Sequence, residues 1–237
     1  MSMSEDSHPP ENRLLAALPA EEYQRLLPHL KPVSLSIHQT INAAREPVTQ
    51  ICFPIRAAVS LVFTMEDGST IEVGLVGQEG MVGIPVILGS NTYPYEAFVQ
   101  VQGSAMLMSA DVLKAEFNLG GQLQTILLRY VQALLVQTSQ TAACNRFHTI
   151  EERFARWLLL VRDCVQSNEF QLTQEIISQM LGTRRSGVTV AAGTLQQAGM
   201  LRYTRGKITI INQEALAAAS CECYGVIKDE FTRLLGK

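Results

Sequence analysis

The stretch Phe170-Gln-Leu-Thr-Gln-Glu-Ile-Ile-Ser-Gln-Met-Leu-Gly-Thr-Arg-Arg-Ser-Gly-Val-Thr-Val-Ala-Ala-Gly-Thr-Leu195 decides the fold of this chain. It predicts two short helices that are separated at Gly182. Thr173 is a favourable N-cap for the first helix, and the glycine ends that helix because it adopts left-handed backbone at low cost. Apolar residues recur on one side of the second helix: Val188, Ala191, Ala192 and Leu195.

The other side of the second helix is polar and begins with two arginines. Arg184 and Arg185 stand at its start, and Ser186 and Thr189 follow on the same side. Adjacent arginines at the start of an amphipathic helix, after a short turn, are typical of a DNA recognition helix. The alternative is an ordinary helical hairpin with a solvated basic end.

A short hairpin follows the two helices. Leu201–Tyr203 and Lys207–Ile211 are expected to be strands that flank the turn Thr204-Arg205-Gly206. The basic side chains at its tip could reach phosphates beside a DNA groove. Residues 146–237 are therefore predicted to form a winged helix-turn-helix that ends in one or two further helices.

Short apolar and β-branched segments recur earlier in the chain, separated by glycine, proline and Asp67-Gly68 turn signals. They predict an antiparallel β-roll, jelly-roll-like, over residues 12–118, so the fold class is α+β. Residues 1–11 are polar and are expected to be a disordered tail. The expected strands are Val33–Ile37, Ile51–Ile55, Ala58–Phe63, Ile71–Val76, Ala97–Val101 and Ala105–Ser109.

An almost uncharged helix is predicted over residues 119–145, between the roll and the helix-turn-helix. Because it is broadly apolar, it needs more than one neighbour, and we expect it to pack on the roll and on a second subunit. Burial inside its own domain is the alternative. The expected dimerisation residues are Leu123, Ile126, Leu127, Tyr130, Val131, Leu134 and Thr138.

Charge is distributed unevenly along the chain. Residues 1–144 hold 7 Lys/Arg and 13 Asp/Glu, whereas residues 145–237 hold 12 Lys/Arg and 9 Asp/Glu. A basic C-terminal half suits contact with DNA. No run of 18 uncharged apolar residues occurs, which predicts no membrane span. The N-terminus lacks the features of a signal peptide and the five cysteines are scattered, so we expect a cytoplasmic protein.

This order of elements resembles the Crp/Fnr superfamily of bacterial transcription regulators. The matching motifs are Leu172-Thr173, Leu181-Gly182, Gly199-Met200-Leu201 and Arg205-Gly206-Lys207. The resemblance implies a homodimeric transcription regulator that binds double-stranded DNA at an operator with two half-sites. It also implies RNA polymerase as a further partner.

The resemblance implies DNA contacts residue by residue. Arg185 matches the base-reading arginine of the family, whereas Ser186 and Val190 replace a glutamate and a second arginine that many members carry, so the family's operator cannot be transferred. The implied DNA-binding residues are Thr173, Gln174, Thr183, Arg184, Arg185, Ser186, Thr189, Val190, Arg205 and Lys207.

The roll departs from the cyclic-nucleotide-binding members of the family. The arginine that would neutralise a cyclic phosphate is missing, and Glu96 would repel that phosphate, so we do not expect cyclic AMP to bind in the usual manner. Residues 1–30 contain no cysteine for an iron–sulfur cluster, and the histidine spacing does not support haem. We predict no cofactor and an unidentified effector, whose candidate pocket comprises Gly83, Ile84, Tyr95, Glu96 and Ala97.

Cys221 and Cys223 suggest a metal ligand pair, but no histidine or second cysteine pair lies close by in the sequence. We therefore predict no metal site. The sequence also lacks a phosphate-binding glycine loop, a nucleophile elbow and a zinc-binding histidine pair, so we predict no catalytic residues and no enzyme. The main alternative to a DNA-binding regulator is a ligand-binding or protein-interaction module whose helix-turn-helix no longer reads DNA.

Overall fold

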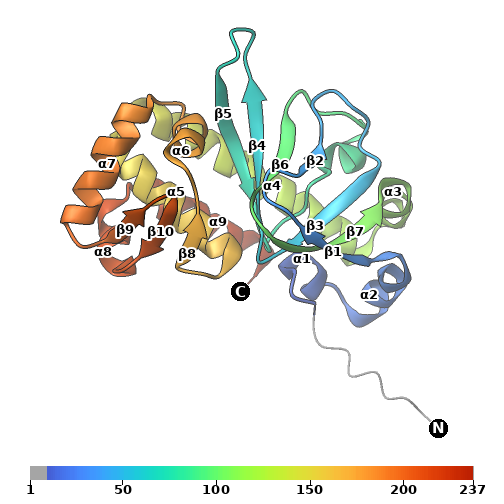
Figure 1. The fold of residues 1–237 in the computed structure, drawn as a ribbon. Helices are drawn as coiled ribbons and strands as arrows, with labels where there is room; N and C mark the ends of the chain where they lie inside the picture. The colour runs from blue at the N-terminus through green and yellow to red at the C-terminus, as the bar shows by residue number, and fades with distance from the viewer. Residues whose placement is uncertain (1–9, 237) are drawn as a thin grey trace.

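The computed structural model describes residues 10–236, so residues 1–9 of the predicted tail lie outside the described part (Figure 1). Two short helices, α1 (Arg13–Ala16) and α2 (Ala20–Leu26), and the turn η1 (Leu27–His29) precede the roll. Buried Asn12 caps α1, accepting hydrogen bonds from the backbone of Leu14 and Leu15. Its amide donates to two carbonyl oxygens of the roll, which fixes these helices against it.

Two antiparallel sheets form the roll, which confirms the predicted fold class. Every predicted strand is present, and the short strand β2 is additional because its three residues carry little sequence pattern. One sheet has the order β1 (Lys31–Leu35), β7 (Gly103–Ser109), β3 (Gln50–Ile55); the other has the order β2 (Thr40–Asn42), β6 (Glu96–Val101), β4 (Ala58–Thr64), β5 (Thr70–Val76). The β4–β5 hairpin rises between the two halves of the molecule (Figure 1). The turn η2 (Ile84–Leu88) and helix α3 (Ala110–Asn118) complete the roll.

Helix α4 (Gly121–Phe147) connects the two halves, and its buried face differs in role from the prediction. Leu123, Ile126, Leu127, Tyr130 and Leu134 belong to the core of the chain's own roll and are at most 7% exposed. They cannot reach a second subunit, so their assignment to a dimer interface is wrong. The heptad-like stripe marks the face that packs on the roll.

Helix α4 also has an exposed face. Leu128 and Leu135 are 46% and 63% exposed, Val131 is half-buried beside them, and Thr138 is exposed. These positions recur every three or four residues, so they follow one line along the helix. Val131 and Thr138 are the two predicted dimerisation residues that remain accessible.

The C-terminal half contains the predicted winged helix-turn-helix. Helix α5 (Ile150–Val165) begins with a capping box between Thr149 and Glu152. The remaining elements are β8 (Glu169–Gln171), α6 (Gln174–Met180), α7 (Arg185–Gln197), β9 (Leu201–Thr204), β10 (Lys207–Ile210), α8 (Gln213–Ala219) and α9 (Cys223–Leu235). The strands pair in the order β8-β10-β9.

Helix α9 returns from the C-terminal half to the roll. Ile227, Phe231 and Leu234 join the core cluster of the roll, and the Phe231 ring lies 6.4 Å from that of Tyr130 on α4. The last helix therefore ties the DNA-binding half to α4. No helix within residues 10–236 is both long and apolar enough to span a membrane.

A buried carboxylate joins the roll to α5. Glu72 on β5 accepts hydrogen bonds from Trp157 Nε1 at 2.8 Å and from Ser60 Oγ at 2.6 Å. Arg153 and Arg156 on α5 are also buried, although arginine side chains are mostly exposed in folded proteins. Arg153 donates a hydrogen bond to the carbonyl oxygen of Leu181, so it stabilises the turn of the helix-turn-helix.

The pH dependence of stability tests this junction. Burial raises the pKa of Glu72 to about 7 from its ordinary value of 4.5, against the effect of its two hydrogen bonds and of Arg156. The folded chain therefore binds this proton more tightly than the unfolded chain does. The contribution of Glu72 to the free energy of unfolding therefore falls as the pH rises from about 4.5 to about 7 and is constant above that range. We expect Glu72→Gln to reduce this slope in thermal unfolding, whereas Glu66→Gln, an exposed control on the same hairpin, retains it. Equal slopes in the wild type and Glu72→Gln would contradict this assignment.

Candidate nucleic-acid interface

Helices α6 and α7 form the helix-turn-helix predicted from the sequence. The side chain of Thr173 caps α6 by accepting a hydrogen bond from Ile176 N at 3.2 Å. Gly182 has a φ of +57° in the turn, and a Cβ on it would lie 2.7 Å from Ile71 Cδ1 on β5. This position needs glycine both for its backbone and for the close approach of the roll.

One face of α7 is exposed along its whole length. Arg185, Ser186, Thr189 and Val190 are exposed, and the 63% exposure of Val190 leaves its methyl groups free. The opposite face, formed by Val188, Ala191, Ala192 and Leu195, is buried as predicted. Thr194 and Gln197 extend the exposed face; they were missed, although the same helical period from Val190 marks them.

The first helix lies directly beside this face. Thr189 Oγ1 is 3.2 Å from Gln174 Oε1 at the start of α6, so the predicted positions on the two helices form one surface. Arg184 is the N-cap residue of α7, and Thr183 in the turn is half-buried. Within residues 10–236, Arg184 and Arg185 have no carboxylate within 4 Å, so neither is paired inside the chain and both can contact an anionic partner.

The two basic residues of the wing differ. Arg205 occupies the tip with a φ of +51° and forms no ion pair in the described part of the chain. Lys207 Nζ lies 2.7 Å from Glu169 Oε2 on β8, so an intramolecular ion pair already occupies it. The hydroxyl of Tyr203 donates to Leu172 O and fixes the wing beside α6. Arg205 is thus the more available of the two for a phosphate.

The β4–β5 hairpin borders the start of the recognition helix. Thr70 and Ile71 of the hairpin and Glu175, Arg184 and Arg185 of the helix-turn-helix line one shallow groove. The roll therefore contacts the part of the molecule that is predicted to meet DNA.

The predicted effector pocket lies in the roll where aromatic side chains pack. Tyr93 OH accepts a hydrogen bond from Gly83 N at 2.6 Å, which connects the two predicted segments. The Tyr93 and Tyr95 rings are 4.6 Å apart, and Glu96 accepts a hydrogen bond from Thr40 Oγ1. The buried Tyr93 ring therefore occupies space beside Gly83, in the region predicted for the effector.

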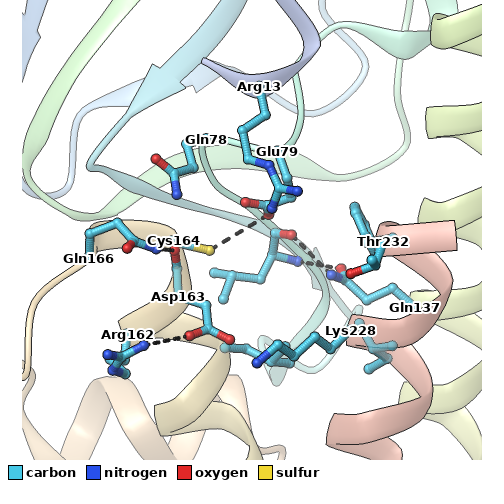
Figure 2. Close-up of a pocket in the computed structure, with 14 residues that line it drawn as sticks. Arg13, Gln78, Glu79, Gln137, Arg162, Asp163, Cys164, Gln166, Lys228 and Thr232 are labelled. Atoms are coloured by element: carbon cyan, nitrogen blue, oxygen red, sulfur yellow. Dashed lines mark hydrogen bonds and ion pairs between the residues drawn. The ribbon is translucent and has the colours of Figure 1, made fainter. Parts of the chain in front are cut away.

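A cavity of about 280 Å³ lies elsewhere, between the roll, α5 and α9. Figure 2 shows Arg13, Glu79 and Cys164 around it, with Lys228 and Thr232 on α9. Burial raises the pKa of Glu79, against the attraction of Arg13. The cavity combines acidic and basic side chains from both halves of the molecule. It could not be predicted from sequence patterns, because its lining comes from distant segments.

Cys221 and Cys223 have neighbours that the sequence did not predict. Cys144 Sγ lies 3.5 Å from Cys221 Sγ, and His148 Nδ1 lies 3.5 Å from Cys223 Sγ. The reason for predicting no metal site, the lack of nearby ligands, is therefore wrong. The fold brings together residues more than 70 positions apart.

Known proteins share both this domain and this fold. Residues 152–219 match the family model of the Crp-like helix-turn-helix domain. The Global nitrogen regulator of Synechocystis sp. is 25% identical over 224 residues, 87% of this chain and 96% of that protein. The CRP-like cAMP-activated global transcriptional regulator of Mycobacterium tuberculosis is 25% identical over 199 residues, 81% of this chain and 89% of that protein. The structure of FixK2 from Bradyrhizobium japonicum shares the fold, with a TM-score of 0.68 and 17% identity over 81% of this chain and 98% of that one.

The helix-turn-helix, its wing and these matches define a DNA-binding transcription regulator. Residues 152–219 form a Crp-like helix-turn-helix domain, and the likeness of the longer chain to Crp/Fnr regulators supports the resemblance that the sequence motifs indicated.

Proposed function

We propose that the chain regulates transcription in the cytoplasm as a homodimer, whose two recognition helices enter successive major grooves of an operator. The observation that carries this proposal is the exposed face of α7, which begins with two arginines that have no partner among the described residues. RNA polymerase is the expected further partner.

Each exposed position has a chemical role in this proposal. Arg185 donates two hydrogen bonds to O6 and N7 of a guanine, a contact that discriminates by roughly 1–3 kcal/mol. Val190 contacts the methyl group of a thymine, and Arg184 supplies a further polar contact. Thr173 and Arg205 contact backbone phosphates on either side of the groove.

The dimer interface is proposed on the exposed face of α4. Leu128, Val131, Leu135 and Thr138 form a narrow apolar line there, which is the arrangement that two parallel helices bury between them. The opposite face packs on the roll, so the helix uses both faces.

The signal is proposed to enter through the roll. Its hairpin contacts the turn of the helix-turn-helix at Gly182 and Ile71, so a change within the roll acts directly on the start of the recognition helix. The cavity between Arg13, Glu79 and Lys228 is a second place where a small polar ligand would contact both halves.

Arg185→Ala tests the DNA contact. On an operator obtained by selection from random DNA, we expect the variant to lose about 5- to 150-fold in affinity, because the bidentate contact to guanine is lost. Its affinity for random DNA should fall much less. Arg233→Ala, which removes an exposed and remote arginine, should change neither affinity. An equal loss on both DNAs would make Arg185 a phosphate contact instead.

Leu135→Glu tests the dimer interface. The side chain is 63% exposed, so the variant should fold with unchanged helix content, but two buried carboxylates would oppose association. We expect sedimentation to report a dimer for the wild type and a monomer for the variant. Ile211→Glu, at a comparably exposed apolar position in the C-terminal half, is the control and should stay dimeric. A monomeric wild type, or a dimeric Leu135→Glu, would contradict the proposed interface.

A further inference from the structure

Four side chains with metal-binding atoms meet where α4 ends and α9 begins. Cys144 lies near the end of α4, His148 directly follows that helix, Cys221 lies between α8 and α9, and Cys223 starts α9. Their ligand atoms all lie within 4.8 Å of one another, and the three cysteines are buried. We propose that these residues form a Cys₃His site for a single tetrahedral metal ion, with zinc as the ion that fits best.

The distances fit one ion held between four ligands. Zinc binds thiolate sulfur at about 2.3 Å and imidazole nitrogen at about 2.0–2.1 Å, so tetrahedral ligand atoms are separated by roughly 3.5–3.8 Å. The Cys144–Cys221 sulfur separation and the Cys223 Sγ–His148 Nδ1 separation are both 3.5 Å. An iron–sulfur cluster needs wider spacing, because several irons and bridging sulfides must fit between the ligands. A disulfide needs sulfurs about 2.05 Å apart.

The residues around the cluster match the surroundings of a zinc site. His148 Nε2 lies 3.2 Å from Glu222 Oε2, which leaves Nδ1 to face the cluster. A carboxylate on the second ring nitrogen is the usual partner of a metal-binding histidine. Gln140 Nε2 donates to Cys223 Sγ at 3.1 Å, as an amide does to a bound thiolate.

A buried arginine offsets the negative charge of the proposed site. Three thiolates and one divalent ion carry a net negative charge, and α5 places the buried guanidinium of Arg156 against α4 near these ligands. Arg156 also donates to Thr141 Oγ1 at 3.3 Å, one turn before Cys144 on α4. A buried cation beside buried thiolates is stabilising, whereas it is costly beside neutral thiols.

The ligand set selects the ion and its role. Soft thiolates with one imidazole favour zinc over magnesium, calcium or manganese. Four protein ligands close the coordination sphere, which is typical of a structural site. Its ligands come from α4, from His148 directly after it, from the α8–α9 connection and from the start of α9, so the ion would fix the DNA-binding half at one angle to α4. The recognition helices of a dimer depend on that angle for their spacing.

Metal analysis of the purified full-length chain tests the proposal. After purification under reducing conditions with zinc present and extensive dialysis, we expect about one zinc ion per chain. Cobalt(II) in place of zinc should give the intense visible absorption and thiolate charge-transfer band of a tetrahedral site. Cys221→Ser and Cys223→Ser should lose both signals, whereas Cys164→Ser, a buried cysteine outside the cluster, should keep them.

Glu222→Gln separates a metal site from a merely structural cluster. The side chain of Glu222 is 71% exposed, so the variant should fold, but zinc affinity should fall about 10- to 100-fold because the histidine loses its orienting partner. Zinc binding should also raise the melting temperature of the wild type and not that of Cys221→Ser. Absence of bound zinc and cobalt, an octahedral cobalt spectrum, iron with labile sulfide, a Cys144–Cys221 disulfide in the reduced preparation, or full zinc retention by the cysteine variants would each overturn the proposal.

Discussion

The arrangement of the two halves depends on the burial of α5 between them. Trp157 contacts the roll and donates a hydrogen bond to the buried carboxylate of Glu72 on β5. Because a buried carboxylate without a hydrogen-bond partner is costly, this contact stabilises the junction. The core of the helix-turn-helix continues through Phe154 and Leu158 into apolar residues of β4 and β5, so the two halves share one core cluster. The roll therefore cannot shift at β5 without displacing the helix that carries the recognition unit. This continuity supports the proposal that a signal in the roll is transmitted to the recognition helix.

Local chemistry made the DNA-binding half predictable from sequence. The capping residue Thr173, the turn glycine Gly182 and the apolar period of α7 each act over a few residues, and all three recur in the structure. Six strands of the roll could be predicted equally well, because alternating apolar residues and turn glycines are local signals. The candidate DNA-binding positions on α7 could be predicted because the apolar period identifies its buried side, and the opposite side is then exposed.

Long-range packing explains what the sequence did not reveal. A helix with two apolar faces does not show which face its own domain covers, so α4 residues such as Tyr130 were assigned to a partner although they pack on the roll. The return of α9 to α4 could not be foreseen, and it is this return that brings Cys223 to Cys144. Arg153 lies on α5 among apolar residues, and only the fold shows that it is buried beneath the helix-turn-helix turn. The proposed zinc site and the shared core thus both depend on contacts between distant segments. The zinc site would join α4 to the start of α9, and the shared core joins β4 and β5 to α5.

Selection of bound sequences from a random DNA pool tests the central claim most directly. A dimer that places two copies of α7 in successive major grooves predicts enrichment of paired, inverted half-sites whose centres lie one helical turn apart, about 10–10.5 base pairs. Guanine should recur in each half at the position that Arg185 reaches. Failure to enrich any sequence, or enrichment of a single unpaired half-site, would contradict the account.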